Sequence, residues 1–339
     1  MKRVLSAHLK PGMVLAEHVC NEAGVVQLHV GTVLSESAAE RFVSLGFGSV
    51  AVEMPDTDDV VVTHSVPREV ISVGRELLRS LHEQARAAGT PEKMNVPYDA
   101  LLDLVHRIDE GLESANENVV EVSPVLSGDD YYYVNPINVA AVSMFVASKA
   151  GLGRRMIEIG LGALLCDIGV AFGGPQEQHP ELGLRVLRQD ARFSAYSKAI
   201  VFQHHERHDG SGFPRALAGE KIEALARIVA VADTYCGLIS EGNSMGMRLP
   251  THEAFDYVTS AAGFDFDRTT VLGVMQYVAP FSVGTVVKLS TGERAIVTRV
   301  YKGLTTRPTV RVVEGGAVRD LVLAEPENQT ILITEVCKE

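Results

Sequence analysis

The sequence predicts a multi-domain protein whose largest part is an all-α helical bundle, with a small α+β module before it and a small β-module after it. The chain has 339 residues, more than the roughly 100–200 residues of a single domain. Hydrophobic residues make up 46% and charged residues 22% of the chain, as in globular proteins, which excludes a disordered or fibrous chain. Apolar residues recur at helical spacing through residues 136–280 and alternate after Pro280.

The N-terminal α+β module is assigned to residues 1–62, where short β-rich runs alternate with glycine-centred turns. Segments 14–15 and 25–28 are expected to pair as a hairpin around a turn at 21–24. Ser35 and its neighbours can cap a helix, which we expect over 35–45. These short elements predict a small mixed module rather than an extension of the bundle.

The helical part of the chain is predicted in two pieces. Residues 63–95 contain apolar residues at helical spacing and are expected to form a helix that connects the N-terminal module to the bundle. Residues 96–280 form the bundle, because short loops separate their helical patterns. Helices are expected near 97–112, 139–150, 156–167, 180–187, 197–205, 222–240, 252–260 and 269–278.

The C-terminal β-module is assigned to residues 281–339, where the apolar period changes from helical spacing to two. Four strands are expected at 285–289, 295–300, 309–313 and 331–333, separated by glycine-containing or polar turns. We expect them to form a compact barrel or a sandwich.

Charge and cysteine content exclude several classes of function. The net charge of -12, from 31 basic and 43 acidic residues, disfavours binding to a nucleic acid polymer. No apolar stretch reaches the ~20 residues of a membrane span, and the N-terminus lacks the apolar core of a secretory signal. A cytoplasmic location is therefore expected. The 4 cysteines lack CxxC spacing, so neither a disulfide framework nor a zinc ribbon is indicated, and the oligomeric state stays open.

Potential metal ligands are concentrated in the helical part of the chain: Asp167, His179, His204, His205 and Asp233. Imidazoles suit Zn, Fe and Mn, and carboxylates can bridge two cations, so this set could build a mononuclear or binuclear centre. Taken singly, each carboxylate could cap a helix and the histidine pair could lie at the surface. Only their combination favours a metal centre.

A glycine-rich loop follows the histidine pair and can approach a ligand closely, because glycine tolerates unusual backbone angles. By itself such a loop could simply end a helix. Its candidate substrate- or partner-binding residues are Arg207, Asp209, Gly210, Gly212, Phe213 and Pro214.

The order of these motifs resembles a known family. HHERHDGSGFP and ARIVAVADTY resemble the HD-GYP signature, in which a His pair leads into a Gly-Tyr-Pro loop and a later helix supplies a metal-binding Asp. CDIG resembles the His-Asp-Ile-Gly of that family, HPELG its third His motif, and YVNPINVAAVS the helix that starts with its first His. The main domain is therefore expected to be an HD-type helical bundle.

The resemblance extends to both ends of the chain. LKPGMVLAEHVCNEAGVV is similar to an N-terminal module often attached to this family, and VGTVVKLSTGERAIVTRV is similar to its C-terminal β-extension. The family resemblance implies hydrolysis of cyclic di-GMP to pGpG or GMP by metal-activated water. It also implies diguanylate cyclase-domain proteins as partners of the glycine-rich loop.

The sequence departs from the family pattern where the chemistry is expected. Asn135 stands at the place of the first ligand His, Cys166 replaces the His of His-Asp, and Val170 replaces a Lys. Phe213 replaces the Tyr of Gly-Tyr-Pro, and 239–243 lacks an Arg-Pro-Tyr-like segment. Nucleotide binding and turnover are both brought into question by these changes.

The family pattern divides the ligands between two metal positions that share Asp167. The first position keeps only Asp167 and Asp233, whereas the second keeps a full set for one cation. We therefore expect one transition metal, Fe, Mn or Zn, with Asp167 as a weak catalytic group. Cys166 is either a substitute ligand for the first position or a small residue that fills it. The second-position ligands are Asp167, His179, His204 and His205.

Three functions are compatible with this pattern. The leading one is a degenerate HD-GYP protein in cyclic di-GMP signalling, with a regulatory or partner-binding role and little or no phosphodiesterase activity. The second is a weak metal-dependent cyclic di-GMP phosphodiesterase. The third is an interaction scaffold that binds no metal, and the retained second-position ligands argue against it.

Overall fold

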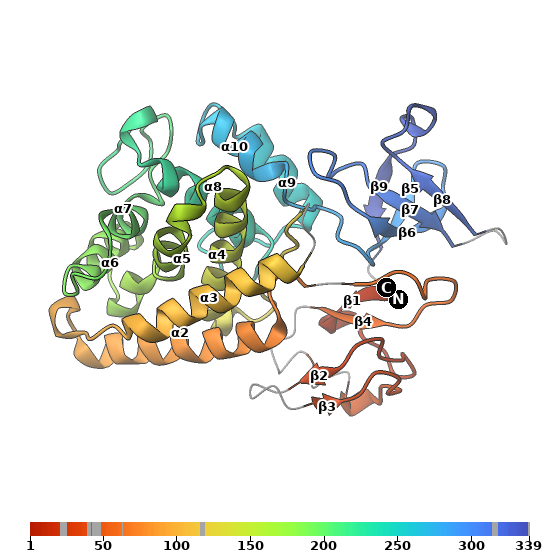
Figure 1. The fold of residues 1–339 in the computed structure, drawn as a ribbon, viewed down its shortest axis with the longest axis horizontal. Helices are drawn as coiled ribbons and strands as arrows, with labels where there is room; N and C mark the ends of the chain where they lie inside the picture. Colours follow the sequence, from red (N-terminus) through yellow and green to blue (C-terminus); the bar gives the residue numbers. More distant parts are fainter. Residues whose placement is uncertain are drawn as a thin grey trace.

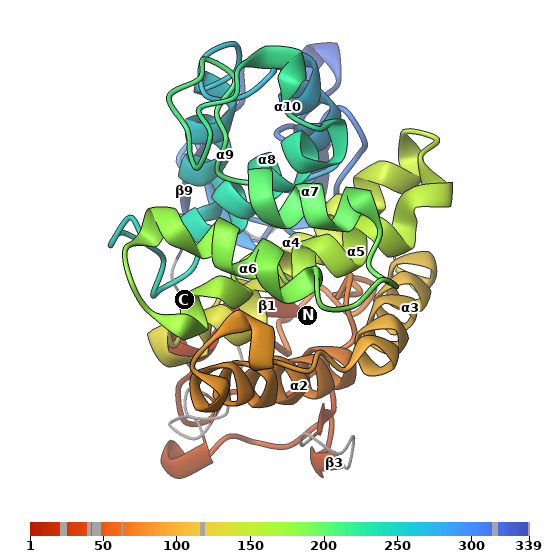
Figure 2. The same cartoon turned by 90° about the vertical axis from the view of Figure 1, so that its left-hand side faces the viewer.

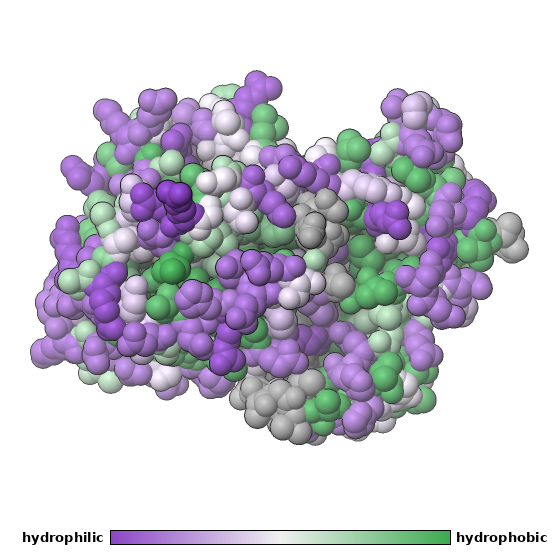
Figure 3. Space-filling view, in the orientation of Figure 1, coloured by the Kyte–Doolittle hydropathy of each residue, from purple (hydrophilic) through white to green (hydrophobic). Residues whose placement is uncertain are grey.

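The structure, a computed structural model, describes residues 1–20, 26–38, 42, 49–62, 64–115, 119–313 and 318–337. It has the three expected parts. A helical bundle lies beside two small β-containing modules, the N-terminal one built around β1 to β4 and the C-terminal one around β5 to β9 (Figure 1). In the same view, hydrophilic residues cover most of the surface, and apolar residues gather in separate small areas (Figure 3). None of the helices described is both long enough and apolar enough to span a membrane.

Two small antiparallel sheets form the N-terminal module. Strand β1 (Lys2–Leu5) pairs with β4 (Ser49–Val52), and β2 (Val19–Cys20) pairs with β3 (Val26–Leu28). A buried apolar cluster of its own, which includes Val4, Leu34 and Phe42, fills the module.

The pairing expected for segment 14–15 was wrong. Val14 bridges to Val33 and Leu15 bridges to Val52, whereas 26–28 pairs with β2. Leu15 is wholly buried beside β4, so burial in the module core explains the choice of partner. The expected turn at 21–24 lies outside the described residues, as do 39–41 and 43–45 of the expected helix.

The helix expected to connect two domains packs into the bundle. Helix α2 (Arg68–Ala88) runs alongside α3 and contacts α4, and its residues Leu78, Leu81 and Ala85 belong to the same buried cluster as the other helices (Figure 1). Helix α2 therefore shares a core with the helices of the bundle.

The bundle is organised around α4, in which every residue from Asn135 to Ala147 is buried. Helices α2, α3, α5 and α8 pack around it, and α6 and α7 form an outer layer near α5 (Figure 2). Its start at Tyr131 lies upstream of the expected residue 139, and Pro136 lies inside the helix, in its second turn. The remaining helices are α3 (Tyr98–Ser114), α4 (Tyr131–Lys149), α5 (Met156–Leu164), α6 (His179–Leu187), α7 (Ala195–Gln203), α8 (Ala224–Leu238), α9 (Thr251–Ser260) and α10 (Arg268–Met275).

The C-terminal module is one five-stranded antiparallel sheet in the order β8-β7-β6-β5-β9, not a two-sheet sandwich or a closed barrel. Strand β8, with the sequence RDLV, was not expected because it lies at an edge and carries two charged, exposed residues without apolar alternation. The strands are β5 (Val286–Leu289), β6 (Arg294–Arg299), β7 (Thr309–Val312), β8 (Arg319–Val322) and β9 (Ile333–Val336).

Candidate metal centre

Four segments of the bundle bring the candidate ligands together. Asp167 lies between α5 and the 3-10 helix Ile168–Phe172, and His179 is the first residue of α6. The histidine pair follows the end of α7, and Asp233 lies in α8. Residues more than sixty positions apart in the sequence therefore meet where α5, α6, α7 and α8 pack together (Figure 2).

Two glycines permit this close approach. A Cβ atom on Gly169 would lie 2.0 Å from the carbonyl oxygen of His179, so only glycine lets the 3-10 helix after Asp167 contact the start of α6. A Cβ atom on Gly183 would lie 2.7 Å from a side-chain methyl of Val201, which brings α6 against α7. The local sequence thus determines how closely the ligand-bearing segments pack.

The four expected second-position ligands converge. Each of Asp167, His179, His204 and His205 offers a ligand atom, and these atoms lie within 4.8 Å of one another. Asp167 Oδ1 lies 3.3 Å from His179 Nε2 and 3.8 Å from His204 Nε2. The two Nε2 atoms lie 3.2 Å apart.

The hydrogen bonds of the two imidazoles leave their Nε2 atoms available to a cation. His179 Nδ1 lies 2.6 Å from the Gln176 carbonyl oxygen, and His204 Nδ1 lies 3.0 Å from that of Val201. Because a carbonyl only accepts, each Nδ1 carries a proton, and in its neutral form each ring presents the lone pair of Nε2 to the other ring and to Asp167. Metal-bound histidines are held in the same way, by an Nδ1–H bond to a carbonyl. The residues therefore fit a transition metal ion.

The electrostatic surroundings favour the neutral forms of the His179 and His205 imidazoles. Burial lowers the pKa of His179 to about 4 although Asp167 opposes the shift, and burial with the neighbouring His204 lowers the pKa of His205 well below its usual value. Burial acts to raise the pKa of Asp167, but the nearby His204, His179 and His205 bring it below its ordinary range. A carboxylate and neutral imidazoles are the protonation states that bind metal.

The depleted first position lies directly beside this set. Cys166, Asp167 and Asp233 also offer ligand atoms within 4.8 Å of one another, so Asp167 is common to both groups. The Cys166 thiol donates to the Ala163 carbonyl oxygen over 3.2 Å, and burial raises the pKa of this thiol. Burial and the nearby Asp167 raise the pKa of Asp233 to about 6.

Asn135 and Val170, at two of the altered family positions, flank the centre differently. Asn135 Nδ2 lies 3.5 Å from Asp233 Oδ1 and 3.3 Å from the Tyr131 hydroxyl, so the residue reaches the first position from α4. Val170 is half-buried in the 3-10 helix after Asp167 and brings no polar group.

The glycine-rich loop folds over the histidine pair. Phe213 stacks on His205, with ring centroids 4.6 Å apart, and its backbone N–H donates to the His205 carbonyl oxygen. Gly212 allows this turn, because its Cβ atom would lie 2.4 Å from the same oxygen. The guanidinium of Arg207 lies over the Phe266 ring, whereas the carboxylate of Asp209 is exposed and bonded within the loop.

The structure adds three residues that the sequence reasoning did not single out. Glu206 is buried and its carboxylate accepts the backbone N–H groups of Arg215 and Leu217, which anchors the glycine-rich loop. Its place directly after the histidine pair is the only sequence signal for this role. Tyr131 lies one helical turn before Asn135 on α4, whereas His82 on α2 approaches the site through tertiary packing.

Comparison with known proteins agrees with this arrangement. Residues 176–270, which contain the three candidate histidine ligands, match the model of the HD domain family. Cyclic di-GMP phosphodiesterase PA4108 of Pseudomonas aeruginosa is 28% identical over 227 residues, which cover 62% of this chain and 54% of that protein. The cyclic di-GMP phosphodiesterase response regulator RpfG of Xanthomonas campestris is 46% identical over 65 residues, 19% of this chain and 17% of that one.

The matched segments thus span about half of the length of PA4108 and a smaller part of RpfG. Among solved structures, Bd1817, a HDG"Y"P protein from Bdellovibrio bacteriovorus, aligns with a TM-score of 0.47 and 16% identity, over 80% of this chain and 97% of that chain. The match to the HD domain model and to these phosphodiesterases, together with the motifs around the converging ligands, supports membership of the HD-GYP family.

Proposed function

We propose that this chain is a degenerate HD-GYP protein in cyclic di-GMP signalling, with a regulatory or partner-binding role and little or no phosphodiesterase activity. The relatives named above are cyclic di-GMP phosphodiesterases, which supports the nucleotide and the pathway. The proposal places one resident transition metal, Fe, Mn or Zn, in the second position. It also places the chain in the cytoplasm.

One observation carries the proposal: the two ligand groups differ in the number of imidazoles that they offer to a metal ion. The second group presents three imidazoles and one carboxylate, with two Nε2 lone pairs already aimed at a common point. The first group has no imidazole, and its thiol is bonded to a backbone carbonyl. A phosphodiesterase of this kind uses two cations together, to activate water and to neutralise the phosphate.

Each retained residue has a definite part in this arrangement. Asp167, His179, His204 and His205 would hold the ion, which when bound supplies Lewis-acid polarisation and a more acidic water. Glu206 positions the loop, and Phe213 covers one face of His205. The same lone-pair convergence disfavours a scaffold without metal, because the buried acceptors would then face one another uncompensated.

The direct test is hydrolysis of cyclic di-GMP by the purified chain with added Mn²⁺ or Fe²⁺ under anaerobic conditions. We expect turnover no faster than that of His204→Ala, together with about one equivalent of metal retained by the wild type after dialysis. Robust turnover that His204→Ala abolishes would overturn the regulatory proposal and establish the weak phosphodiesterase as the function.

The partner-binding part of the proposal rests on the loop Asp209–Pro214 and on diguanylate cyclase-domain proteins as partners. Phe213 is half-buried, so its ring both shapes the loop and leaves an aromatic edge for contact. Pull-down from the native cell with wild type and Phe213→Ala tests it, with circular dichroism as a control for folding. An identical set of partners would leave Phe213 as a packing residue only.

A further inference from the structure

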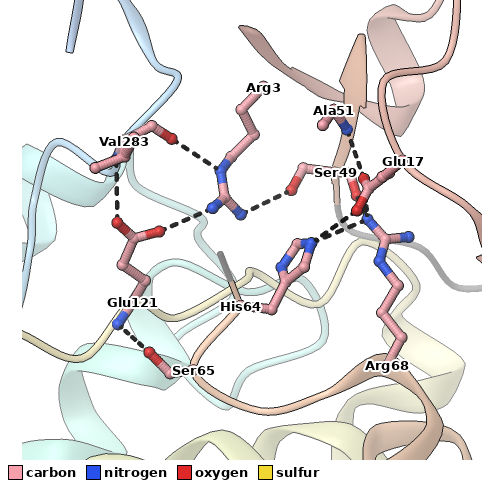
Figure 4. A network of polar contacts seen from close by, with 9 residues as sticks. All are labelled: Arg3, Glu17, Ser49, Ala51, His64, Ser65, Arg68, Glu121 and Val283. Atoms are coloured by element: carbon pink, nitrogen blue, oxygen red, sulfur yellow. Dashed lines mark hydrogen bonds and ion pairs between the residues drawn. The ribbon is translucent and has the colours of Figure 1, made fainter. Parts of the chain in front are cut away.

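A second buried polar cluster lies outside the ligand group, where the N-terminal module meets the bundle (Figure 4). We call it the junction. Its ionisable side chains come from four segments of the chain and are between 5% and 19% exposed. They are Arg3 on β1, Glu17 before β2, His64 and Arg68 at the start of α2, and Glu121 before α4. The cluster is therefore complete only while the N-terminal module is docked on the bundle.

The guanidinium and carboxylate groups of the junction form two pairs. Arg3 Nη2 lies 2.8 Å from Glu121 Oε2, and Arg68 Nη2 lies 2.8 Å from Glu17 Oε1. While the ring of His64 is neutral, the positive and negative charges of these two pairs cancel. The protonation state of this one ring therefore decides whether the junction carries an excess charge.

The ring of His64 lies between the two pairs (Figure 4). Its Nε2 atom is 3.2 Å from Glu17 Oε2 and 3.4 Å from Arg68 Nη2. Burial lowers the pKa of His64, Glu17 opposes the shift, and Arg3 and Arg68 add to it. A protonated ring would place a third positive charge beside two guanidinium groups in a largely buried place, which is unfavourable.

The N-terminal module can separate from the bundle without breaking a shared apolar core. Its buried apolar cluster and the cluster of the bundle helices have no residue in common. Contacts of this kind between parts of one chain are polar, and relative motion across them is expected. A cavity of about 10 Å³, lined by Arg3, His64 and Glu121 among others, has room for about one water molecule, which gives a proton access to the ring.

We propose that the junction is a pH-sensitive switch, which holds the N-terminal module against the bundle while His64 is neutral and opens when His64 gains a proton. The charged groups that face the ring are Arg3, Glu17, Arg68 and Glu121. In the open state the ring titrates near its usual pKa of about 6.5. The closed state is thus fully favoured above about pH 6.5 and is weakened as the pH falls from there toward the lowered pKa of the closed state. The inference is independent of the metal centre, because the junction contains none of the candidate ligands.

The test is hydrogen–deuterium exchange of the full chain at about pH 7.5 and about pH 5.5, which bracket the usual pKa of histidine, with a correction for the intrinsic effect of pH on exchange. Two amides report on the junction, because the Ala51 N–H donates to the Glu17 carboxylate and the Glu121 N–H donates to the Ser65 hydroxyl oxygen. In the wild type their protection should fall at the lower pH, by at most about tenfold, which is the limit for one proton at about one pH unit below 6.5. In His64→Gln, whose side chain cannot gain a charge, the protection should be the same at both pH values.

His29→Gln is the matched control, because it removes an exposed histidine of the same module and should leave the wild-type response unchanged. His64→Asn replaces the glutamine variant if circular dichroism shows that this variant is not folded. Protection that stays constant in the wild type would overturn the switch. An equal fall in the wild type and in the His64 variant would also overturn it, and would assign the response to Glu121, whose pKa is raised by burial. Either result would leave the proposed metal centre intact.

Discussion

Two buried polar clusters in this molecule, the junction between the modules and the candidate metal centre, differ in how their carboxylates are neutralised. The junction between the two small modules and the bundle pairs each carboxylate with a guanidinium: Glu121 lies 2.8 Å from Arg3, and Glu17 lies 2.8 Å from Arg68 (Figure 4). Backbone groups complete the pairing, because Glu121 also accepts from the Val283 N–H. The charges of this junction are therefore balanced by the chain itself.

The ligand cluster has no such internal partner. Among the described residues, the ion pairs of Asp167 are with His179 and His204 only, and both of these imidazoles present lone pairs. When both rings are neutral, acceptors face acceptors, and a bound cation would supply the positive charge. Buried carboxylates thus form stabilising ion pairs at the junction, whereas at the candidate metal centre they form a potential binding site.

The largest expected effect comes from removing the ion pair between Arg3 and Glu121 at the junction. Arg3→Met leaves the buried Glu121 carboxylate without its guanidinium and should destabilise the fold by about 3–5 kcal/mol, measured by urea unfolding. Arg107→Met is the control, because the Arg107–Asp103 pair is exposed and should contribute about 0–1 kcal/mol. Equal losses in the two variants would show that the junction is not a desolvated ion pair.

The second prediction concerns pH and a histidine beside the ligand cluster. Among the described residues His82 Nδ1 has no hydrogen-bond partner, and burial lowers the pKa of His82 to about 4, against an opposing effect of Asp167. The unfolded chain takes up a proton below about pH 6.5 and the folded chain only below about pH 4, so stability falls as pH decreases between these values. The shift corresponds to about 3 kcal/mol.

His82→Phe keeps an aromatic ring between Tyr132 and Tyr133 and should flatten the dependence of the unfolding free energy on pH over this interval. His106→Gln, at an exposed position of α3, should leave the dependence unchanged. An unaltered slope in His82→Phe would assign the acid sensitivity to other groups.

The third prediction separates the two clusters by adding metal. At a free metal concentration of 100 times Kd, the folded state should gain about 2.7 kcal/mol. His204→Ala should abolish this gain, whereas Arg3→Met should keep it although the fold is weaker, because its network contains none of the ligands. Denaturant unfolding with and without the ion measures both, and a gain that persists in His204→Ala would place the metal elsewhere.

The smallest expected effect concerns Phe213, whose ring stacks on His205 in the ligand cluster. Phe213→Leu removes the stacking on His205 and should cost about 0.5–1.5 kcal/mol of unfolding free energy. Phe264→Leu is a suitable control, because Phe264 is 69% exposed and its replacement should stay within about 0.5 kcal/mol. Indistinguishable variants would mean that the ring adds nothing to stability where it lies.

The local pattern of the sequence was sufficient for the helices and for the choice of ligands. Apolar residues at helical spacing predicted α6 and α9 to within a residue of their bounds, because each helix buries one face. The residue types in CDIG, HPELG and HHER were sufficient to propose a metal centre, since carboxylates and imidazoles in apolar surroundings have few other uses.

Only the tertiary structure decided how distant segments meet. The partners of Val14 and Leu15, the edge strand β8 and the packing of α2 into the bundle all depend on long-range contacts that no periodicity records. The same holds for the proton on each Nδ1 and for the unpartnered oxygen of Asn135, because each follows from a neighbour that lies elsewhere in the fold. Sequence by itself therefore determined which donors are present, and packing decided which of them face a common cation.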